Sequence, residues 1–297
     1  MADPYAGMPQ LPGVTHRQVQ VRGFAMHVAE AGHGEPLLLV HGWPQHWWCW
    51  HQVLPELARH YRVIAPDLRG FGWSEAPASG YDKENLADDL IGLLDALELK
   101  QVRLIGHDWG GWTGFLLAQK AHARISRFVA LSIPHPWQHD RPLTWQLMKR
   151  LSYQIVMATP WLGTQVWKLR PGEMRKQFNR AIYDPKPWTK EAWEIYFARF
   201  REPARGWASS QMYRQFLLHE APAIRKGRYR HAKLPMPVLH LVGERDPVCT
   251  PSALAGYENH APHYTLKVIP RCGHFLPEEQ PQVLLEQALP FLAADSP

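Results

Sequence analysis

The sequence predicts a protein of the α/β class, built on a mostly parallel, twisted sheet that is flanked by helices and carries an inserted helical cap. Two observations predict this fold class. Apolar runs typical of buried strands alternate with segments of helical spacing in the first 134 residues, and the alternation returns after residue 232. Residues 135–232 are instead rich in Trp, Tyr, Arg and Pro and show no buried-strand pattern. We therefore expect a core of residues 1–134 and 233–297, with residues 135–232 as the cap.

The first core segment opens with two strands. "HRQVQVRG" (16–23) and "FAMHVAEAG" (24–32) alternate apolar and polar residues, which predicts an antiparallel pair joined by a turn. The units that follow alternate strand and helix, which implies parallel strands with right-handed crossovers. Buried strands are predicted over residues 36–42, 61–70, 101–105 and 125–134, and helices over residues 50–60, 83–99 and 112–122.

The rest of the chain continues one interrupted core and does not start a second one. Helical spacing dominates the insertion, and strand character returns only after it. The predicted elements here are helices over residues 142–160, 190–200, 252–260 and 281–293, and strands over residues 236–246 and 264–274.

Composition and charge argue against nucleic acid and membranes as partners. The formal net charge is +6, from 33 Lys and Arg against 27 Asp and Glu, but the basic residues are scattered and form no block of five. The most basic stretch, Arg225–Lys233, has no recognisable nucleic-acid-binding motif and is interpreted as a solvated surface. The sequence also contains no run of eighteen apolar residues, the length that a membrane-spanning helix needs.

The cysteines and the first residues indicate a reducing compartment. Cys49, Cys249 and Cys272 are odd in number and far apart, which argues against a disulfide framework. The opening residues, "MADPYAGMPQLPGV", do not show the charged and apolar regions of a secretory signal. We therefore expect a cytoplasmic protein. A homodimer is compatible with the sequence.

The stretch "GHDWGG", residues 106–111, has the setting of a nucleophile elbow. It joins a predicted buried strand to a predicted helix through small residues, and Asp108 stands where such elbows usually carry a serine. A plain helix N-cap is the structural alternative for an aspartate at this position. The flanking glycines favour the elbow, since a cap does not need so constricted a turn.

Two further polar residues follow predicted strands in the order expected of a catalytic triad. His274, in "RCGHFLP", is the candidate base, and Asp246, in "VGERDPV", would bind its far ring nitrogen and fix the tautomer. Glu244 competes for the second role, because the same loop could offer either acid. Pro247 favours Asp246, since it marks the turn that usually holds this acid.

A carboxylate nucleophile predicts a two-step reaction. Aspartate is ionised at neutral pH and can displace a leaving group at an sp³ carbon, which gives an alkyl ester. His274 would then take a proton from water, and attack of that water on the ester builds an oxyanion. The backbone N–H groups of Trp109 and of Trp43, in "HGWP", are the candidate oxyanion donors, and the Trp43-Pro44 peptide bond is a candidate for the cis form.

Over nearly its full length the chain resembles the epoxide hydrolases of the α/β-hydrolase superfamily, in their aspartate-nucleophile branch. The matching pieces are "HGWPQ", "DLRGFGWS", "GHDWGG", "GERDPV" and "GHFLPEEQP", in this order. The resemblance implies the α/β-hydrolase fold with a cap, and hydrolysis of an epoxide to a vicinal diol through an ester on Asp108. "DLRGFGWS" is interpreted as a structural turn beside the elbow, and Arg69 and Glu278-Glu279 as turn and helix-start residues.

Dehalogenases of the same fold also use an aspartate nucleophile, so the elbow alone does not decide between the two activities. Epoxide opening needs an acid for the departing oxygen, whereas a halide leaves without one. The resemblance places two tyrosines on the insertion for this purpose, and Tyr153 and Tyr213 resemble those positions in local context. The sequence also lacks the asparagine and arginine of dehalogenases, because Trp43 and Trp109 stand at those positions. Three other tyrosines lack the context of that pair: Tyr183, Tyr196 and Tyr229.

Other classes of function fit the sequence less well. A binding protein on a disabled hydrolase scaffold has no reason to keep all five candidate residues. The segment "HWWCWH", residues 46–51, matches no zinc spacing and is interpreted as an aromatic wall beside the oxyanion loop. The predicted chemistry needs no cofactor and no metal. The expected substrate is a small apolar epoxide, because the sequence has many tryptophans.

Overall fold

The computed structural model describes residues 5–137, 152–249 and 251–294. It contains an eight-stranded sheet in the order β1-β2-β4-β3-β5-β6-β7-β8. β1 and β2 pair antiparallel, as do β2 and β4, and the remaining neighbours are parallel. The strands are β1 Thr15–Val21, β2 Phe24–Ala31, β3 Pro36–Val40, β4 Arg62–Pro66, β5 Val102–His107, β6 Ile125–Leu131, β7 Val238–Gly243 and β8 Tyr264–Ile269. The predicted fold class is confirmed.

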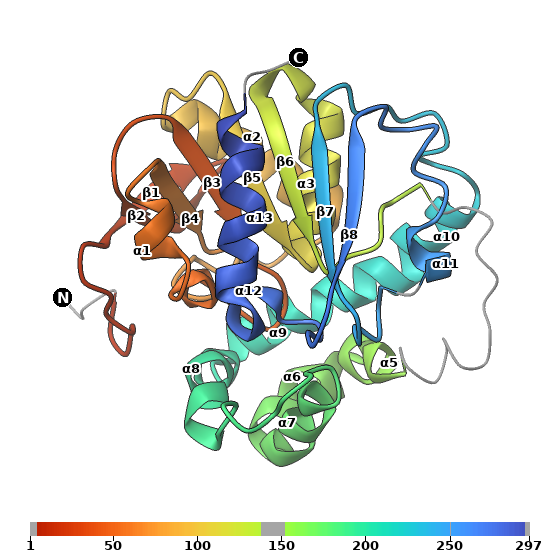
Figure 1. Cartoon of the computed structure of the whole chain (residues 1–297). Coiled ribbons are helices and arrows are strands. Elements are labelled where there is room, and N and C mark those ends of the chain that lie inside the picture. The colour runs from red at the N-terminus through yellow and green to blue at the C-terminus, as the bar shows by residue number, and fades with distance from the viewer. Residues whose placement is uncertain (1–4, 138–151, 250, 295–297) are drawn as a thin grey trace.

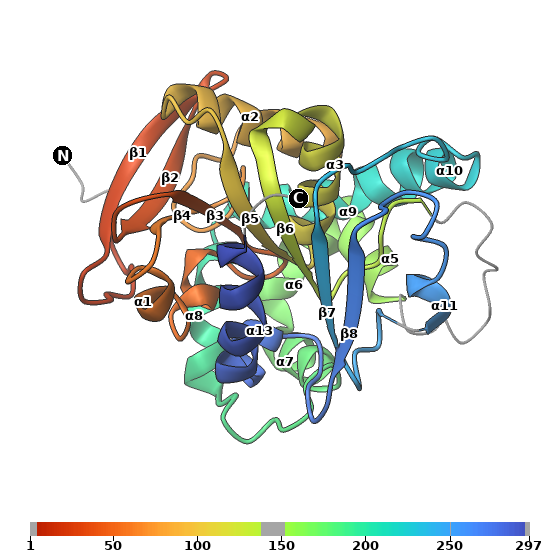
Figure 2. The same ribbon diagram turned by 45° about the horizontal axis from the view of Figure 1, so that its top comes forward.

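Helices cover both faces of the sheet, as its apolar strands require. α2 (Lys83–Ala96) and α3 (Trp109–Lys120) lie together on one face, and α1 (Leu54–Leu57) and α13 (Pro281–Ala293) on the other (Figures 1 and 2). The continuous apolar runs of β3 and β7 are buried because the sheet is covered on both sides. Four short helices complete the described part of the core: the 3₁₀ helices Trp47–Trp50 and His122–Arg124, and the α-helices α11 (Pro251–Leu254) and α12 (Leu276–Glu279).

The segment between β6 and β7 contains no strand in its described part. Most of its helices gather at one end of the sheet, below it in the view of Figure 1. They are α5 Tyr153–Ala158, α6 Pro160–Leu169, α7 Pro171–Asn179, α8 Lys190–Phe200, α9 Pro203–Gln215, the π-helix η3 Phe216–Glu220 and α10 Ala221–Arg225. The helix predicted over residues 142–160 is seen only as α5, since its first part lies outside the described residues. The boundaries of the cap stay a prediction.

Two predicted helices are much shorter than expected. The helix predicted over residues 50–60 is only α1, with Pro55 in its first turn, where a missing N–H is tolerated. The helix predicted over residues 252–260 ends as α11, and two residues beyond its end Gly256 has φ +89°, a backbone conformation that no right-handed helix continues. The apolar spacing was present in both places; a proline marks the start of α1, and the backbone conformation of Gly256 prevents α11 from continuing.

Three further expectations concern the cysteines, membrane-spanning helices and the basic stretch. All three cysteines are buried thiols. Across the described ranges, no helix has the length and apolar content needed to cross a membrane. The charged side chains of the basic stretch Arg225–Lys233 are exposed to solvent, as predicted.

Candidate active site

Asp108 occupies a sharp turn between β5 and α3. Its backbone has φ +49° and ψ −126°, a conformation that L-residues rarely adopt. The turn is tight because its glycines leave no room for side chains: a Cβ on Gly106 would lie 2.7 Å from the Gly110 oxygen, and one on Gly110 would lie 2.2 Å from the Val40 oxygen. Within the described residues the Asp108 carboxylate accepts no capping hydrogen bond from α3. The geometry is that of an elbow and not of a simple cap.

The structure brings the two other predicted triad residues to this elbow. Nδ1 of His274 lies 3.1 Å from Oδ2 of Asp246, and its Nε2 lies 3.6 Å from Oδ1 of Asp108. All three side chains are buried. Glu244, the competing acid, is exposed and accepts a hydrogen bond from the Arg271 backbone N–H instead. The geometry therefore pairs His274 with Asp246.

The charges around His274 favour its protonated form. Burial lowers the pKa of His274, but the Asp246 and Asp108 carboxylates outweigh this effect and raise it to about 10. Asp246 stays ionised because its Oδ1 accepts hydrogen bonds from two backbone N–H groups, at 2.8 and 3.3 Å. Burial raises the pKa of Asp246, and His274 together with these donors brings it below its ordinary value. The imidazolium is thus held between two carboxylates.

One predicted oxyanion donor binds the Asp108 carboxylate, and the other is the backbone N–H of the residue that follows Asp108. The N–H of Trp43 donates to Oδ2 of Asp108 at 2.9 Å, and the Trp43-Pro44 peptide bond is cis. The N–H of Trp109 belongs to the first residue of α3, where a helix offers no internal acceptor. The Trp43 indole is fixed in turn by a 2.8 Å hydrogen bond from its Nε1 to Ser209 Oγ on α9.

Tyr153 on α5 and Tyr213 on α9 lie edge to face, and the Trp43 indole contacts both rings. Their ring centroids are 5.8 Å apart, and the centroid of the Trp43 ring lies 5.6 Å from Tyr153 and 4.8 Å from Tyr213. Burial and the Asp108 carboxylate raise the pKa of Tyr153 to about 12. Burial raises the pKa of Tyr213 well above its usual value, and Tyr153 and Asp108 add to the effect. Both phenols are therefore protonated at neutral pH and can donate.

The three other insertion tyrosines make contacts away from this pair. The Tyr196 hydroxyl donates to Glu278 at 2.7 Å, and the Tyr229 hydroxyl donates to Glu84 at 2.7 Å. The Arg245 guanidinium lies over the Tyr183 ring, with its Cζ 4.8 Å from the ring centroid.

Sequence reasoning missed the side chains that hold the His274 loop. Glu279 was interpreted as a helix-start residue, but its carboxylate accepts three backbone N–H bonds of 2.8–2.9 Å, from Tyr183, Gly273 and Phe275. His107, the last residue of β5, contacts the His274 carbonyl oxygen through Nε2 at 2.8 Å. The acid in the first turn of α12 was a visible signal, but nothing local in the sequence indicates what it binds.

The motif "DLRGFGWS" has the structural role expected of it. The buried Asp67 carboxylate accepts hydrogen bonds from the backbone N–H groups of Trp47 (2.7 Å) and Trp73 (2.8 Å), and contacts His27 Nδ1 at 2.7 Å. Arg69 was predicted as a turn residue, but it also forms a buried two-point ion pair with Asp89 at 2.7 and 2.8 Å.

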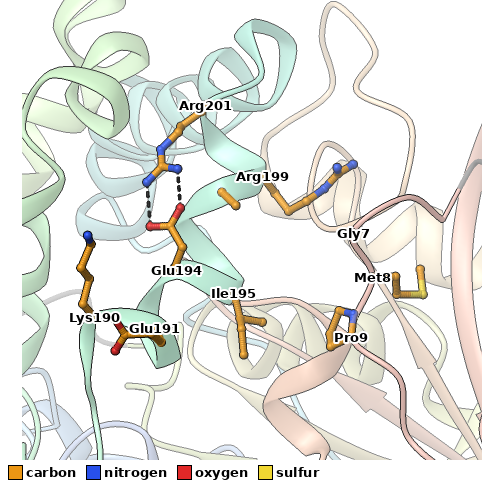
Figure 3. A pocket seen from close by; sticks show the side chains of 10 residues that line it. Gly7, Met8, Pro9, Lys190, Glu191, Glu194, Ile195, Arg199 and Arg201 are labelled. Atoms are coloured by element: carbon orange, nitrogen blue, oxygen red, sulfur yellow. Dashed lines mark hydrogen bonds and ion pairs between the residues drawn. The ribbon is translucent and has the colours of Figure 1, made fainter.

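Neither a metal site nor the groove of Figure 3 competes with the triad. The described residues contain no group of His, Cys, Asp and Glu side chains arranged to hold a metal ion. A groove of about 690 Å³ lies between the N-terminal residues Gly7–Pro9 and one side of α8, where Glu194 and Arg201 form an ion pair (Figure 3). Its lining includes none of the predicted catalytic residues.

Comparisons with known proteins identify the family of the chain. Residues 35–281 match the family described as alpha/beta hydrolase fold. The soluble epoxide hydrolase of Corynebacterium sp. (strain C12) is 32% identical, with 94% of this chain and 98% of the relative covered. Epoxide hydrolase 4 of Homo sapiens is 28% identical, with 95% and 80% covered. The solved structure "Epoxide hydrolase CorEH without ligand" superposes with a TM-score of 0.84 at 30% identity over 94% of this chain and 99% of that one. The chain therefore belongs to the α/β-hydrolase superfamily and, within it, to the epoxide hydrolase family.

Proposed function

We propose that this protein is an epoxide hydrolase that adds water to a small apolar epoxide, giving a vicinal diol through an ester on Asp108. The observation that carries the proposal is the placement of two protonated phenols beside a carboxylate nucleophile, with one tryptophan ring in contact with both phenols. The names of the relatives agree with it. The buried thiols fit a reducing, cytoplasmic setting.

In the first step, Oδ1 of Asp108 attacks an epoxide carbon. Oδ2 is already engaged by the Trp43 N–H, so Oδ1 is the oxygen that can form the new bond. As the C–O bond of the epoxide breaks, the departing oxygen takes a proton from Tyr153 or Tyr213. The products are an alkyl ester on Asp108 and one tyrosinate.

Ester formation then changes the charge around His274. The ester removes the negative charge of Asp108, which is one of the two carboxylates that raise the pKa of His274. The imidazolium can therefore give up its proton, which restores the phenol. His274 becomes a neutral base. Asp246 holds the imidazole ring in its orientation through the 3.1 Å contact to Nδ1.

In the second step, His274 takes a proton from water, and the water oxygen attacks the ester carbonyl carbon. The negative charge develops on Oδ2, where the Trp43 N–H already points, with the Trp109 N–H as the second donor. Collapse of this intermediate breaks the bond between the carbonyl carbon and the alkoxy oxygen. The leaving alkoxide takes the proton from His274, which gives the diol. The Asp108 carboxylic acid formed in this step then passes its proton to His274, which regenerates the Asp108 carboxylate and the resting imidazolium.

Dehalogenation is the second candidate, and the tyrosine pair is the observation against it. A halide does not need the two phenols, and Trp43 and Trp109 occupy the positions where dehalogenases are expected to carry asparagine and arginine. Release of halide from chloroalkanes without any diol from epoxides would support that alternative.

The proposal is tested by trapping the ester. The variant His274→Gln should form it but not hydrolyse it, so intact-mass analysis after incubation with styrene oxide, cyclohexene oxide or a fatty-acid epoxide should show the protein plus one epoxide. Wild-type enzyme in ¹⁸O-water should place unlabelled oxygen from Asp108 in the diol of the first turnover. No adduct together with solvent oxygen in that diol would overturn the two-step scheme.

A further inference from the structure

Lys83, the first residue of α2, is fully buried beside the elbow. Its Nζ donates to the Met212 carbonyl oxygen at 2.9 Å, pairs with Glu220 Oε1 at 3.3 Å and lies 4.3 Å from the centroid of the Trp109 ring. An isolated buried ammonium group is costly, so these partners are needed to keep it in this position.

Two of the three partners of Lys83 are chain neighbours of candidate active-site residues. Trp109 follows Asp108 in the chain, and the centroid of its ring lies 5.9 Å from that of the Tyr213 ring. Met212 immediately precedes Tyr213 on α9. The Lys83 ammonium therefore contacts the Tyr213 segment from the backbone side and the Trp109 indole from its face.

Glu220 completes the arrangement as a counter-ion. It is buried in the π-helix η3, a helix type that occurs often at functional sites, and its Oε2 also accepts from the Lys83 backbone N–H at 3.4 Å. Burial lowers the pKa of Lys83, whereas Glu220, Asp82 and Asp108 oppose this change. Burial likewise raises the pKa of Glu220, and Lys83 opposes it. Each member of the pair thus favours the charged form of the other.

We propose that Lys83 is a positioning residue for the first chemical step, because its ammonium holds the Trp109 indole and the Tyr213 hydroxyl in register with Asp108. Glu220 acts as its counter-ion. The inference deepens the proposed function and rests on it. The alternative is that the pair only joins α2 to the insertion and contributes to stability alone.

The two roles separate in single-turnover kinetics. Lys83→Met removes the charge and keeps most of the length of the side chain. Ester formation, followed by rapid quench and intact mass, should slow about ten- to hundredfold, the cost of a misplaced reacting group. Ester hydrolysis should change little, because that step uses His274 and backbone donors and not Tyr213. A lower melting temperature with both rate constants unchanged would overturn the inference.

Two further variants control the experiment. Lys120→Met removes a partly exposed lysine that also joins α2 to α3, through Glu84 and Asp88, and should leave both steps unchanged. Lys83→Met/Glu220→Leu replaces the buried pair with apolar side chains, a change that often preserves folding, and should still slow ester formation. Ester formation at the wild-type rate in that folded double variant would contradict the positioning role. If the wild-type protein forms no ester with any epoxide, the proposed function fails, and this inference fails with it.

Discussion

The backbone N–H of Trp43 donates a 2.9 Å hydrogen bond to Oδ2 of Asp108. This contact joins the loop after β3 to the elbow after β5, two strands that lie side by side in the sheet. The two segments approach so closely because residue 42 is glycine: a Cβ there would lie 2.4 Å from Asp108 Cβ and 2.7 Å from its Oδ2. A donor is therefore in place before any charge develops on that oxygen.

Gly42→Ala should lower kcat/KM at least about hundredfold, the typical cost of losing one oxyanion donor. The added methyl group would push the Trp43 N–H or the Asp108 carboxylate out of place. Steady-state diol formation measures the effect. Gly172→Ala is the matched control, because a Cβ on Gly172 meets nothing within 4 Å. Equal activity of Gly42→Ala and Gly172→Ala would show that the close approach is not needed.

Replacing Tyr153 and Tyr213 together with Phe should slow epoxide opening about 10²- to 10⁴-fold, the usual contribution of general acid catalysis. Each single replacement should cost less, since the other phenol still donates. Rapid-quench measurement of ester formation isolates this step. Tyr229→Phe, which removes a hydroxyl bonded to Glu84, should have no effect on it. If displacement of a halide were slowed as strongly as epoxide opening, the tyrosines would be packing residues.

Glu279→Gln should slow hydrolysis of the ester, because one amide oxygen cannot accept the three backbone N–H bonds that fix the His274 loop. The neighbouring Glu278→Gln is the control. Burial raises the pKa of Glu278 to about 8, so this carboxyl is mostly protonated at neutral pH and an amide replaces it closely. Decay of the ester adduct at pH 7 compares the two variants. Equal decay in both would mean that Glu279 does not position His274.

The sequence predicted the parts of the site that follow from local chemistry. Asp108, Asp246 and His274 each follow a strand of a parallel sheet, so their meeting at one sheet edge could be expected from topology alone. The placement of Tyr153 and Tyr213 was predicted only through family resemblance, because both lie on helices whose packing over the sheet has no local signature.

The missed contacts join segments that are distant in the sequence. Lys83 and Glu220 are 137 residues apart, and Glu279 reaches back 96 residues to Tyr183. The burial of Lys83 could not be predicted for a second reason. In the sequence it stands in the first turn of an amphipathic helix, where a lysine is usually exposed. The predicted lengths of α1 and α11 were wrong for a different reason: the local apolar spacing indicated longer helices than the backbone forms.

Stability should depend on pH through His274. Its pKa in the folded protein, about 10, lies above the ordinary value of 6.5, so its protonation favours the folded state. This contribution is complete below pH 6.5 and is lost as the pH rises through about 10. Between these values the free energy of unfolding should lose about 1.4 kcal/mol per pH unit from this group.

His274→Gln isolates that contribution, because the variant keeps every other titrating group. Urea unfolding of both proteins from pH 6 to pH 10 gives the difference in unfolding free energy at each pH. The advantage of the wild-type protein should shrink as the pH rises, since the imidazole loses the proton that pairs with Asp246 and Asp108. An advantage that stays constant over this range would mean that the imidazole is already neutral in the resting protein. The proton that restores the tyrosine after ester formation would then have to come from solvent and not from His274.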